Sequence, residues 1–302
     1  MTKIVPTLWF DTEARAAVEF YTALFPNSGI RYTAMLHDTP SGVVDIVSFQ
    51  LAGQPFQAFS AGSPFKFNPS ISFIVNFDPA QDPRAREHLD ALWHALSEGG
   101  QVLMPLEEYF FSQRYGWVQD RYGLSWQLIL SNPEGDPRPF ITPALLFTGR
   151  VCGKAEEAGA FYRSVFADSQ AGQLRFYPEH TEPNCGKMVM FSDFRLGETW
   201  IAAMDSALDH GFGFNEAMSF TVKCETQAEI DGYWERLSAE PEAEQCGWLK
   251  DRYGLSWQIV PALMDTIMQS PHLEGQARVT QAILQMKKLD IATLHSAYEG
   301  TG

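Results

Sequence analysis

One hairpin-like segment occurs twice in this chain. GWVQDRYGLSWQLI runs from Gly116 to Ile129, and GWLKDRYGLSWQIV runs from Gly247 to Val260. Each DRYG is typical of a tight turn, because an aspartate accepts hydrogen bonds from backbone N–H groups ahead of it and a glycine adopts positive φ at little cost. The repeat predicts two related parts, and 302 residues are enough for each part to bury a core of its own.

The repetition extends over most of the chain and keeps its register. Helix-like segments carry Tyr21 and then Trp93 in the first copy, and Tyr162 and then Trp234 in the second, so each pair is 72 residues apart (93 − 21 and 234 − 162). Each copy also divides into two similar halves, in which a strand, an amphipathic helix and further strands follow one another. We therefore predict four βαβββ modules and an α+β fold class.

The pattern also predicts where the domains begin and end. We expect a first domain at 1–132, a polar, proline-rich linker at 133–139, a second domain at 140–262 and a helical tail at 263–302. From the second tryptophan to the DRYG aspartate there are 27 residues in the first copy and 17 in the second, so the copies are related but not equivalent. Two separate clefts are predicted, one in each domain.

Four further stretches accompany the repeated turn: the strand LWF before a helix ending in FYTALF, the strand FNPSISF, the ending CGWLKDRYGLSWQIVP and the tail MKKLDIATLHSA. With these motifs, essentially the whole chain resembles the PhnB-like, 3-demethylubiquinone 3-methyltransferase-like branch of the vicinal oxygen chelate superfamily, which also holds glyoxalases, bleomycin-resistance proteins and dioxygenases. The resemblance implies that two βαβββ units per domain form an open half-barrel sheet around a cleft. It also implies that the tandem domains replace the dimer that shorter relatives form.

The same resemblance implies a place for a metal ion, which the residues of this chain do not suit. Metal-dependent members carry a glutamate on the final strand and a histidine on the first. At those positions this chain has Gln127 and Gln258, and the triplets Val5-Pro6-Thr7 and Thr142-Pro143-Ala144. Neutral amides are weak ligands for transition metals. HExxH, paired-cysteine and glycine-rich nucleotide motifs are also absent, so we expect neither a metal nor a cofactor.

The two glutamines are the leading candidates for ligand contact. A strand alternates its faces, so Gln127 and Ser125 point into the cleft if their apolar neighbours pack on the helices. Gln57 lies on the other strand that supplies ligands in the superfamily, and the second copy has Ile201 near that position. We therefore expect the first copy to be the working site, with an aromatic segment as its lid. The candidate ligand-binding residues are Gln57, Gln127, Ser125, His37, Tyr109, Phe111 and Gln258, and no catalytic residue is assigned. The alternative for Gln127 and Gln258 is a satisfied amide in the core.

Two classes of function remain open. The first is a module that binds an amphipathic or cationic small molecule, and the second is an enzyme of the superfamily, including methyltransferase-like activity. Transfer from S-adenosylmethionine usually uses a glycine-rich loop after a strand, which the sequence does not show. The formal charge of -15 argues against nucleic acid as a partner. The lack of long apolar runs and of a signal-peptide pattern predicts no membrane association and a cytoplasmic location. A homodimer stays open.

Overall fold

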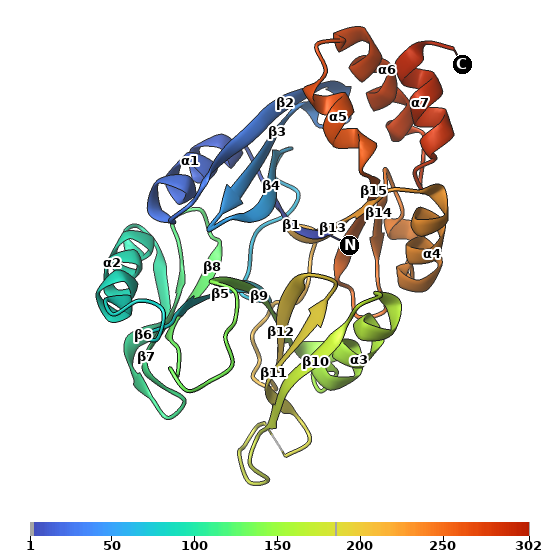
Figure 1. The fold of residues 1–302 in the computed structure, drawn as a ribbon. Helices are drawn as coiled ribbons and strands as arrows, with labels where there is room; N and C mark the ends of the chain where they lie inside the picture. The colour runs from blue at the N-terminus through green and yellow to red at the C-terminus, as the bar shows by residue number, and fades with distance from the viewer. Residues whose placement is uncertain (1–2, 185, 302) are drawn as a thin grey trace. The chain divides into compact units, whose positions relative to one another are not determined.

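The computed structural model describes residues 3–184 and 186–301, and its strands and helices form two compact units. Unit 1 combines Met1–Lys66 with Phe214–Gly302, and unit 2 consists of Phe67–Gly213. Each unit is built on one mixed sheet with helices packed against it (Figure 1). The α+β fold class predicted from the repeat is therefore confirmed.

The sheet of unit 1 has seven strands in the order β14-β15-β13-β1-β4-β3-β2. Strands β1 and β13 are antiparallel neighbours, and β4 and β15 flank them in parallel. Helices α1 and α4 pack against this sheet, and the tail helices α5 and α6 pack beside β2. The bounds are β1 Lys3–Phe10, α1 Ala14–Leu24, β2 Gly29–Thr39, β3 Gly42–Leu51, β4 Gln54–Ser60, β13 Met218–Cys224, α4 Gln227–Leu237, β14 Trp248–Lys250, β15 Ser256–Pro261, α5 Leu263–Gln269, α6 Leu273–Leu284 and α7 Ile291–Glu299.

The sheet of unit 2 has eight strands in the order β10-β11-β12-β9-β5-β8-β7-β6. Strands β5 and β9 are antiparallel neighbours, and β8 and β12 flank them in parallel. The bounds are β5 Ile71–Phe77, α2 Ala85–Ser97, β6 Gln101–Tyr109, β7 Ser112–Gln119, β8 Ser125–Leu130, β9 Ile141–Phe147, α3 Ala155–Val165, β10 Gln170–Phe176, β11 Val189–Leu196 and β12 Thr199–Asp205. No helix in the described parts of the chain is long and apolar enough to cross a membrane.

The two units do not follow the two sequence copies. Unit 1 joins the first module to the fourth through β1 and β13, and unit 2 joins the second to the third through β5 and β9. The boundaries expected at 1–132 and 140–262 follow the repeat in sequence, whereas the compact units cut across them. The physical reason is that, within each module, one edge of the first strand has backbone N–H and C=O groups without partners. The first strand of any other module can form hydrogen bonds to that edge.

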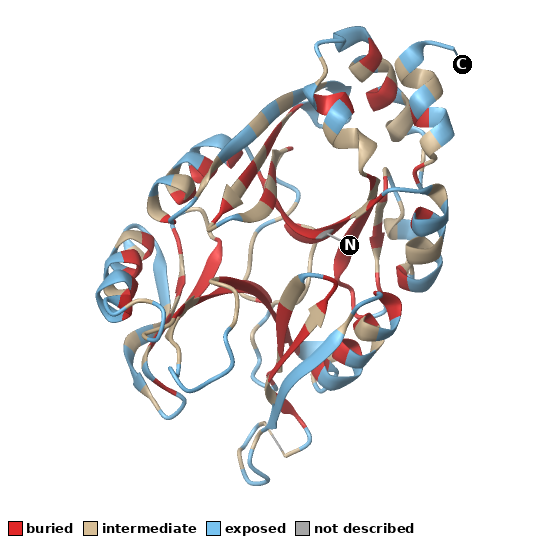
Figure 2. Cartoon of the chain, viewed as in Figure 1, coloured by how far each residue is buried: buried red, intermediate tan, exposed pale blue. Residues whose placement is uncertain are grey.

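The repeated turn has the predicted structure, and its aspartate also binds the core. The Asp120 carboxylate accepts hydrogen bonds from the backbone N–H groups of Tyr122 at 2.8 Å and Leu124 at 3.1 Å, and from Nε1 of Trp126 at 2.8 Å. Equivalent bonds surround Asp251 in the second copy. Both carboxylates are buried, as are the central strands of each unit (Figure 2). Each turn is therefore tied to its core by a satisfied buried charge.

Candidate functional site

Unit 1 brings two threonine–glutamine pairs together on one face of its sheet. Thr7 on β1 lies opposite Gln57 on β4, and Thr221 on β13 lies opposite Gln258 on β15. The hydroxyl oxygens of Thr7 and Thr221 are 2.8 Å apart, so a hydrogen bond joins the two pairs. Because β1 and β13 run antiparallel, the second pair repeats the first with approximate two-fold symmetry.

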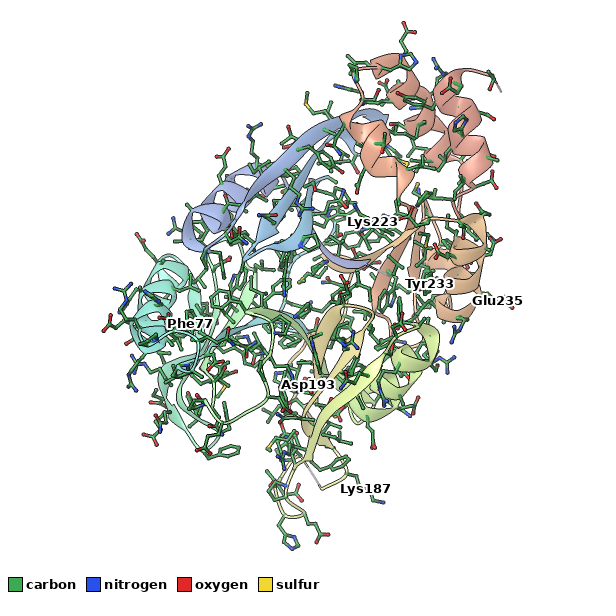
Figure 3. All side chains as sticks on the ribbon, in the orientation of Figure 1. Phe77, Lys187, Asp193, Lys223, Tyr233 and Glu235 are labelled. Carbon is green, nitrogen blue, oxygen red and sulfur yellow. The ribbon has the colours of Figure 1, made fainter. Side chains whose placement is uncertain are left out.

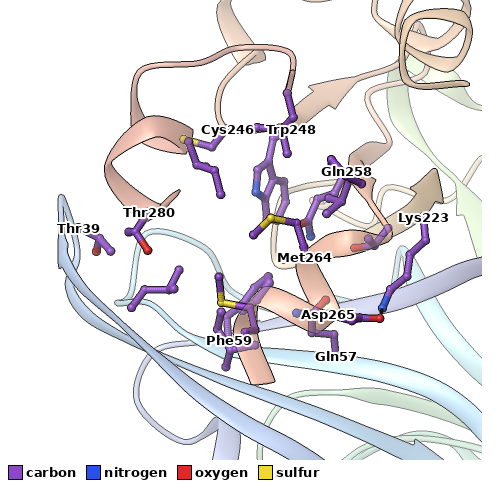
Figure 4. A pocket seen from close by; sticks show the side chains of 18 of the residues that line it. Thr39, Gln57, Phe59, Lys223, Cys246, Trp248, Gln258, Met264, Asp265 and Thr280 are labelled. Carbon is purple, nitrogen blue, oxygen red and sulfur yellow. Dashed lines mark hydrogen bonds and ion pairs between the residues drawn. The ribbon is translucent and has the colours of Figure 1, made fainter. Parts of the chain in front are cut away.

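A cavity of about 200 Å³ lies on this face of unit 1 (Figure 4). The sheet contributes both glutamines and Thr221, together with aromatic side chains such as Phe59 and Trp248. The C-terminal tail supplies a further wall, which consists of Met264, Asp265, Met268, Thr280, Ile283, Leu284 and Leu289. The tail therefore encloses space that the half-barrel sheet would leave open, and it does so mainly with apolar side chains.

Asp265 on α5 ties the tail to the sheet. The Tyr32 hydroxyl donates to Oδ1 of Asp265 at 2.9 Å, and Lys223 on β13 forms an ion pair with Oδ2 (Figure 4). Burial and, after it, the charge of Asp265 raise the pKa of Tyr32, so its phenol stays protonated and continues to donate. Among the described residues that line the cavity, Lys223 and Asp265 are the only ones with a formally charged side chain, and they neutralise each other.

The two glutamines of the cavity differ in their hydrogen bonds. Nε2 of Gln258 donates to the Ser219 hydroxyl at 2.9 Å, which fixes the orientation of the amide. The carbonyl oxygen of the same amide takes no part in this bond. The side chain of Gln57 makes no hydrogen bond to the described residues, and Gln57 is half-buried at the cavity wall. An amide has two N–H donors and a carbonyl acceptor, so Gln57 can both donate to a ligand and accept from it.

The matching positions of unit 2 are mostly apolar. Ile74 lies opposite Gln127, Ala144 lies opposite Ala202, and the isoleucine and both alanines form one buried cluster. Both polar atoms of the Gln127 amide have a partner, because Nε2 donates to Ser72 at 2.8 Å and Oε1 accepts from the Tyr115 hydroxyl at 2.8 Å. Both hydrogen bonds of the Gln127 side chain are therefore made within unit 2.

A residue of the expected linker also covers part of unit 2. Nε of Arg138 donates to Oδ2 of Asp193 at 2.6 Å, and the guanidinium lies 4.1 Å from the centre of the Trp200 ring. Asp193, labelled in Figure 3, faces the same side of the sheet as Ala202, its partner in register. An ion pair and a cation–π contact thus occupy this side of unit 2.

The predicted site residues are divided between the two units. Gln57, Gln258 and His37 belong to unit 1, whereas Gln127, Ser125, Tyr109 and Phe111 belong to unit 2. Gln57 therefore shares its cavity with Gln258 and lies in a different unit from Gln127. His37 is exposed on β2 and does not line the cavity. Ser125 is buried and accepts a hydrogen bond from Nε1 of Trp117 at 2.7 Å.

Sequence reasoning missed several polar residues of the cavity, among them Thr221, Lys223 and Asp265. Thr221 could have been found by aligning the first strand of module four with that of module one, since it repeats Thr7. Lys223 follows two positions later on the same face of the strand. Asp265 belongs to the tail, which has no counterpart after the first copy, so no repeat points to it.

The residues of unit 1 do not fit a divalent transition metal. Its four matching positions hold Thr7, Gln57, Thr221 and Gln258, all of them neutral side chains. Such ions are bound by imidazole, thiolate and carboxylate groups, and hydroxyl and amide oxygens are poor substitutes. Within residues 3–184 and 186–301, no group of three or more His, Cys, Asp or Glu side chains is arranged to hold a metal ion.

Comparison with known families gives two matches along the chain. A family model described as 3-demethylubiquinone-9 3-methyltransferase matches residues 2–129 and again residues 139–260. A PhnB protein from Bacillus cereus, described as a 3-demethylubiquinone-9 3-methyltransferase, is 32% identical over 42% of this chain and 98% of its own, with a TM-score of 0.38. No curated protein matches the chain at a significant level.

Two solved structures of one plant enzyme share the fold over a longer span. Glyoxalase I from Zea mays is 12% identical over 78% of this chain and 79% of its own, with a TM-score of 0.51. A variant of that enzyme is 10% identical over 89% of this chain and 96% of its own, with a TM-score of 0.52. At this level of identity the likeness concerns the fold alone, and it agrees with the vicinal oxygen chelate architecture of tandem βαβββ modules.

Proposed function

This chain belongs to the 3-demethylubiquinone-9 3-methyltransferase family, and we propose that it binds a small, uncharged organic molecule in the unit 1 cavity without a metal ion. The observation that supports the proposal is the lining of that cavity, which is apolar except for a few neutral polar groups and one ion pair. Small-molecule sites have this composition, because apolar walls provide affinity and a few polar groups fix orientation.

The charge of the ligand follows from the pairing of Lys223 with Asp265. Because these two side chains already neutralise each other, an ionic ligand would lose its hydration in the cavity without gaining a counter-charge. A neutral ligand with hydrogen-bonding oxygens has no such penalty and can bind the amides of Gln57 and Gln258. The sequence favours an amphipathic or cationic ligand, whereas the ion pair in the cavity favours an uncharged one.

The size of the cavity limits the ligand further. A volume of about 200 Å³ is below the range of about 300–1,000 Å³ that holds drug-sized ligands, so a compound of one or two rings suits it. The family description favours a second candidate function, which is methyl transfer to such a ring. S-adenosylmethionine and a ring acceptor together exceed this volume, so that function requires the tail to move away from the sheet.

A series of naphthalenes that differ only in charge tests the proposal. 2-Naphthol is neutral, 2-naphthoate is anionic and 2-naphthylmethylammonium is cationic, and the binding of each can be measured by isothermal titration calorimetry and by the change in Tm. We expect 2-naphthol to bind and raise Tm, and the two ions to bind at least about tenfold more weakly. Equal binding of all three, or binding of an ion alone, would contradict the proposal. A rise in Tm with S-adenosylmethionine would instead favour methyl transfer.

A further inference from the structure

The turn between β6 and β7 places two phenylalanines in solvent. Tyr109 and Ser112 are paired across the hairpin, so Phe110 and Phe111 alone form its turn. Phe110 is 84% exposed and Phe111 is 47% exposed. Two-residue turns favour Asn, Asp and Gly because of their backbone conformation, and neither phenylalanine has a positive φ. Local folding therefore gives no reason for two large apolar side chains here, and such departures from local preference occur at functional surfaces.

The exposed rings are held in a fixed arrangement. Phe111 stacks on Tyr109 with ring centres 5.6 Å apart, and it meets Tyr115 edge to face at 5.0 Å. Phe110 packs edge-on against Phe111 at 5.1 Å. Tyr115 is itself anchored in the core, since its hydroxyl donates to Gln127 at 2.8 Å. A partner would thus meet an aromatic surface that is already ordered, which lowers the entropic cost of binding.

The surroundings of these rings are negatively charged. Glu107 and Glu108 are exposed next to Tyr109, and neither forms an ion pair with the described residues. The hairpin at 101–119 contains a single basic residue, Arg114, whose Nε is already bound to Asp90 at 2.8 Å. Two uncompensated carboxylates therefore flank the exposed aromatic rings.

We propose that this hairpin tip, defined as Glu107–Phe111, docks a basic segment of a partner protein. Arginine or lysine side chains of the partner lie over the rings of Phe110 and Phe111, where cation–π attraction acts, and face the carboxylates of Glu107 and Glu108. The contact is small, so the complex is transient and weakens as salt is added. The proposal does not use the unit 1 cavity and is independent of its ligand.

Other occupants of the tip fit the structure less well. A second copy of the chain would place the same carboxylates against each other, and an anionic membrane surface would repel them. A strand added to the edge of β6 would meet Pro105, which has no N–H to donate. Positively charged side chains can interact with both groups, through cation–π contacts with the rings and through ion pairs with the carboxylates.

The test uses the full chain and a short synthetic peptide of alternating arginine and leucine that carries an uncharged fluorophore. Fluorescence anisotropy is followed for wild type, for the double variant F110S/F111S, for E107Q/E108Q and for the control Val102→Ser. Val102 is 48% exposed on the same strand, outside the tip. We expect at least about tenfold weaker binding for F110S/F111S, a smaller loss with less salt dependence for E107Q/E108Q, and no change for Val102→Ser.

Because F110S/F111S keeps every charge of the chain, loss of binding in that variant cannot come from general attraction between acidic protein and basic peptide. Unchanged binding in the double variant would overturn the proposal. So would equal binding of a peptide in which glutamate replaces arginine. A wild-type dimer that F110S/F111S abolishes in sedimentation, or binding of wild type to anionic vesicles that this variant lacks, would assign the tip to another occupant and overturn it as well.

Discussion

The carboxylate of Asp265 on α5 is paired with the ammonium group of Lys223 on β13. The same carboxylate accepts the Tyr32 hydroxyl from β2 at 2.9 Å, so one side chain of the tail binds two strands of the unit 1 sheet. These contacts lie at the wall of the cavity, and the two charged side chains of that wall neutralise each other. They therefore connect the position of the tail with the charge of the cavity wall.

Replacing Asp265 by Asn should destabilise unit 1 modestly. The change leaves Lys223 without its counter-charge beside apolar side chains, and both side chains of the pair are only partly buried, so we expect a loss of about 1 kcal/mol in the free energy of unfolding. Urea unfolding measures it. The control is Asp231→Asn, which breaks the more exposed Lys288–Asp231 pair of 2.6 Å. An equal or larger loss in the control would show that Asp265 has no special role.

The same Asp265→Asn change should alter ligand preference. With Lys223 unpaired, the cavity has a net positive charge, so 2-naphthoate should bind about tenfold more tightly than it binds wild type, while 2-naphthol changes little. Isothermal titration calorimetry measures both affinities. If the anion gains nothing, the ion pair does not control the charge of the ligand.

Gln57→Leu and Gln258→Leu should each weaken the binding of 2-naphthol by about 1–3 kcal/mol, because each removes a hydrogen-bonding partner of the ligand. Gln127→Leu is the matched control, since Gln127 holds the corresponding strand position in unit 2 and is engaged by Ser72 and Tyr115. Isothermal titration calorimetry gives the three affinities. The outcome that sequence reasoning favours, in which Gln127 matters and Gln258 does not, would place the ligand in unit 2.

Asp120→Ala should destabilise unit 2, and Asp251→Ala should destabilise unit 1. Each change leaves two backbone N–H groups and a buried tryptophan N–H without their acceptor, so we expect a loss of about 2–4 kcal/mol in each case. Thermal unfolding followed by tryptophan fluorescence measures it. Asp11→Ala, at an exposed position, is the control and should have almost no effect.

His210 should make unit 2 less stable in mild acid. Its Nε2 lies 2.7 Å from the Ser206 hydroxyl, and burial lowers the pKa of His210. A lowered pKa means that the folded state prefers the neutral ring, so its contribution to stability is present above the unfolded pKa of about 6.5 and is lost as pH falls through the folded pKa. Urea midpoints of wild type and His210→Gln should therefore differ less at low pH than at neutral pH. A constant difference would exclude this linkage.

Local features of the chain were predictable from the sequence because they depend on neighbours in sequence. The DRYG turns form as expected, since Asp120 binds N–H groups two and four residues ahead. The order of the four modules and the membership of the superfamily follow from repeats and motifs of the same local kind, but the fourth module has two strands after α4, β14 and β15, where three were predicted. Gln258, one of the two repeated glutamines, lines the unit 1 cavity from β15.

The partners of these residues were decided by the tertiary structure. A first strand can pair with the first strand of any other module, and the choice of β13 for β1 depends on how the whole chain packs. That choice separates Gln57 from Gln127 and brings it to Gln258. The tail then adds Asp265 to a site whose other residues come from strands, which no periodicity in the sequence encodes. The pairing of strands that are far apart in the sequence depends on side-chain packing and on backbone hydrogen bonds at strand edges over the whole chain. Only the folded molecule therefore shows which amides share a cavity.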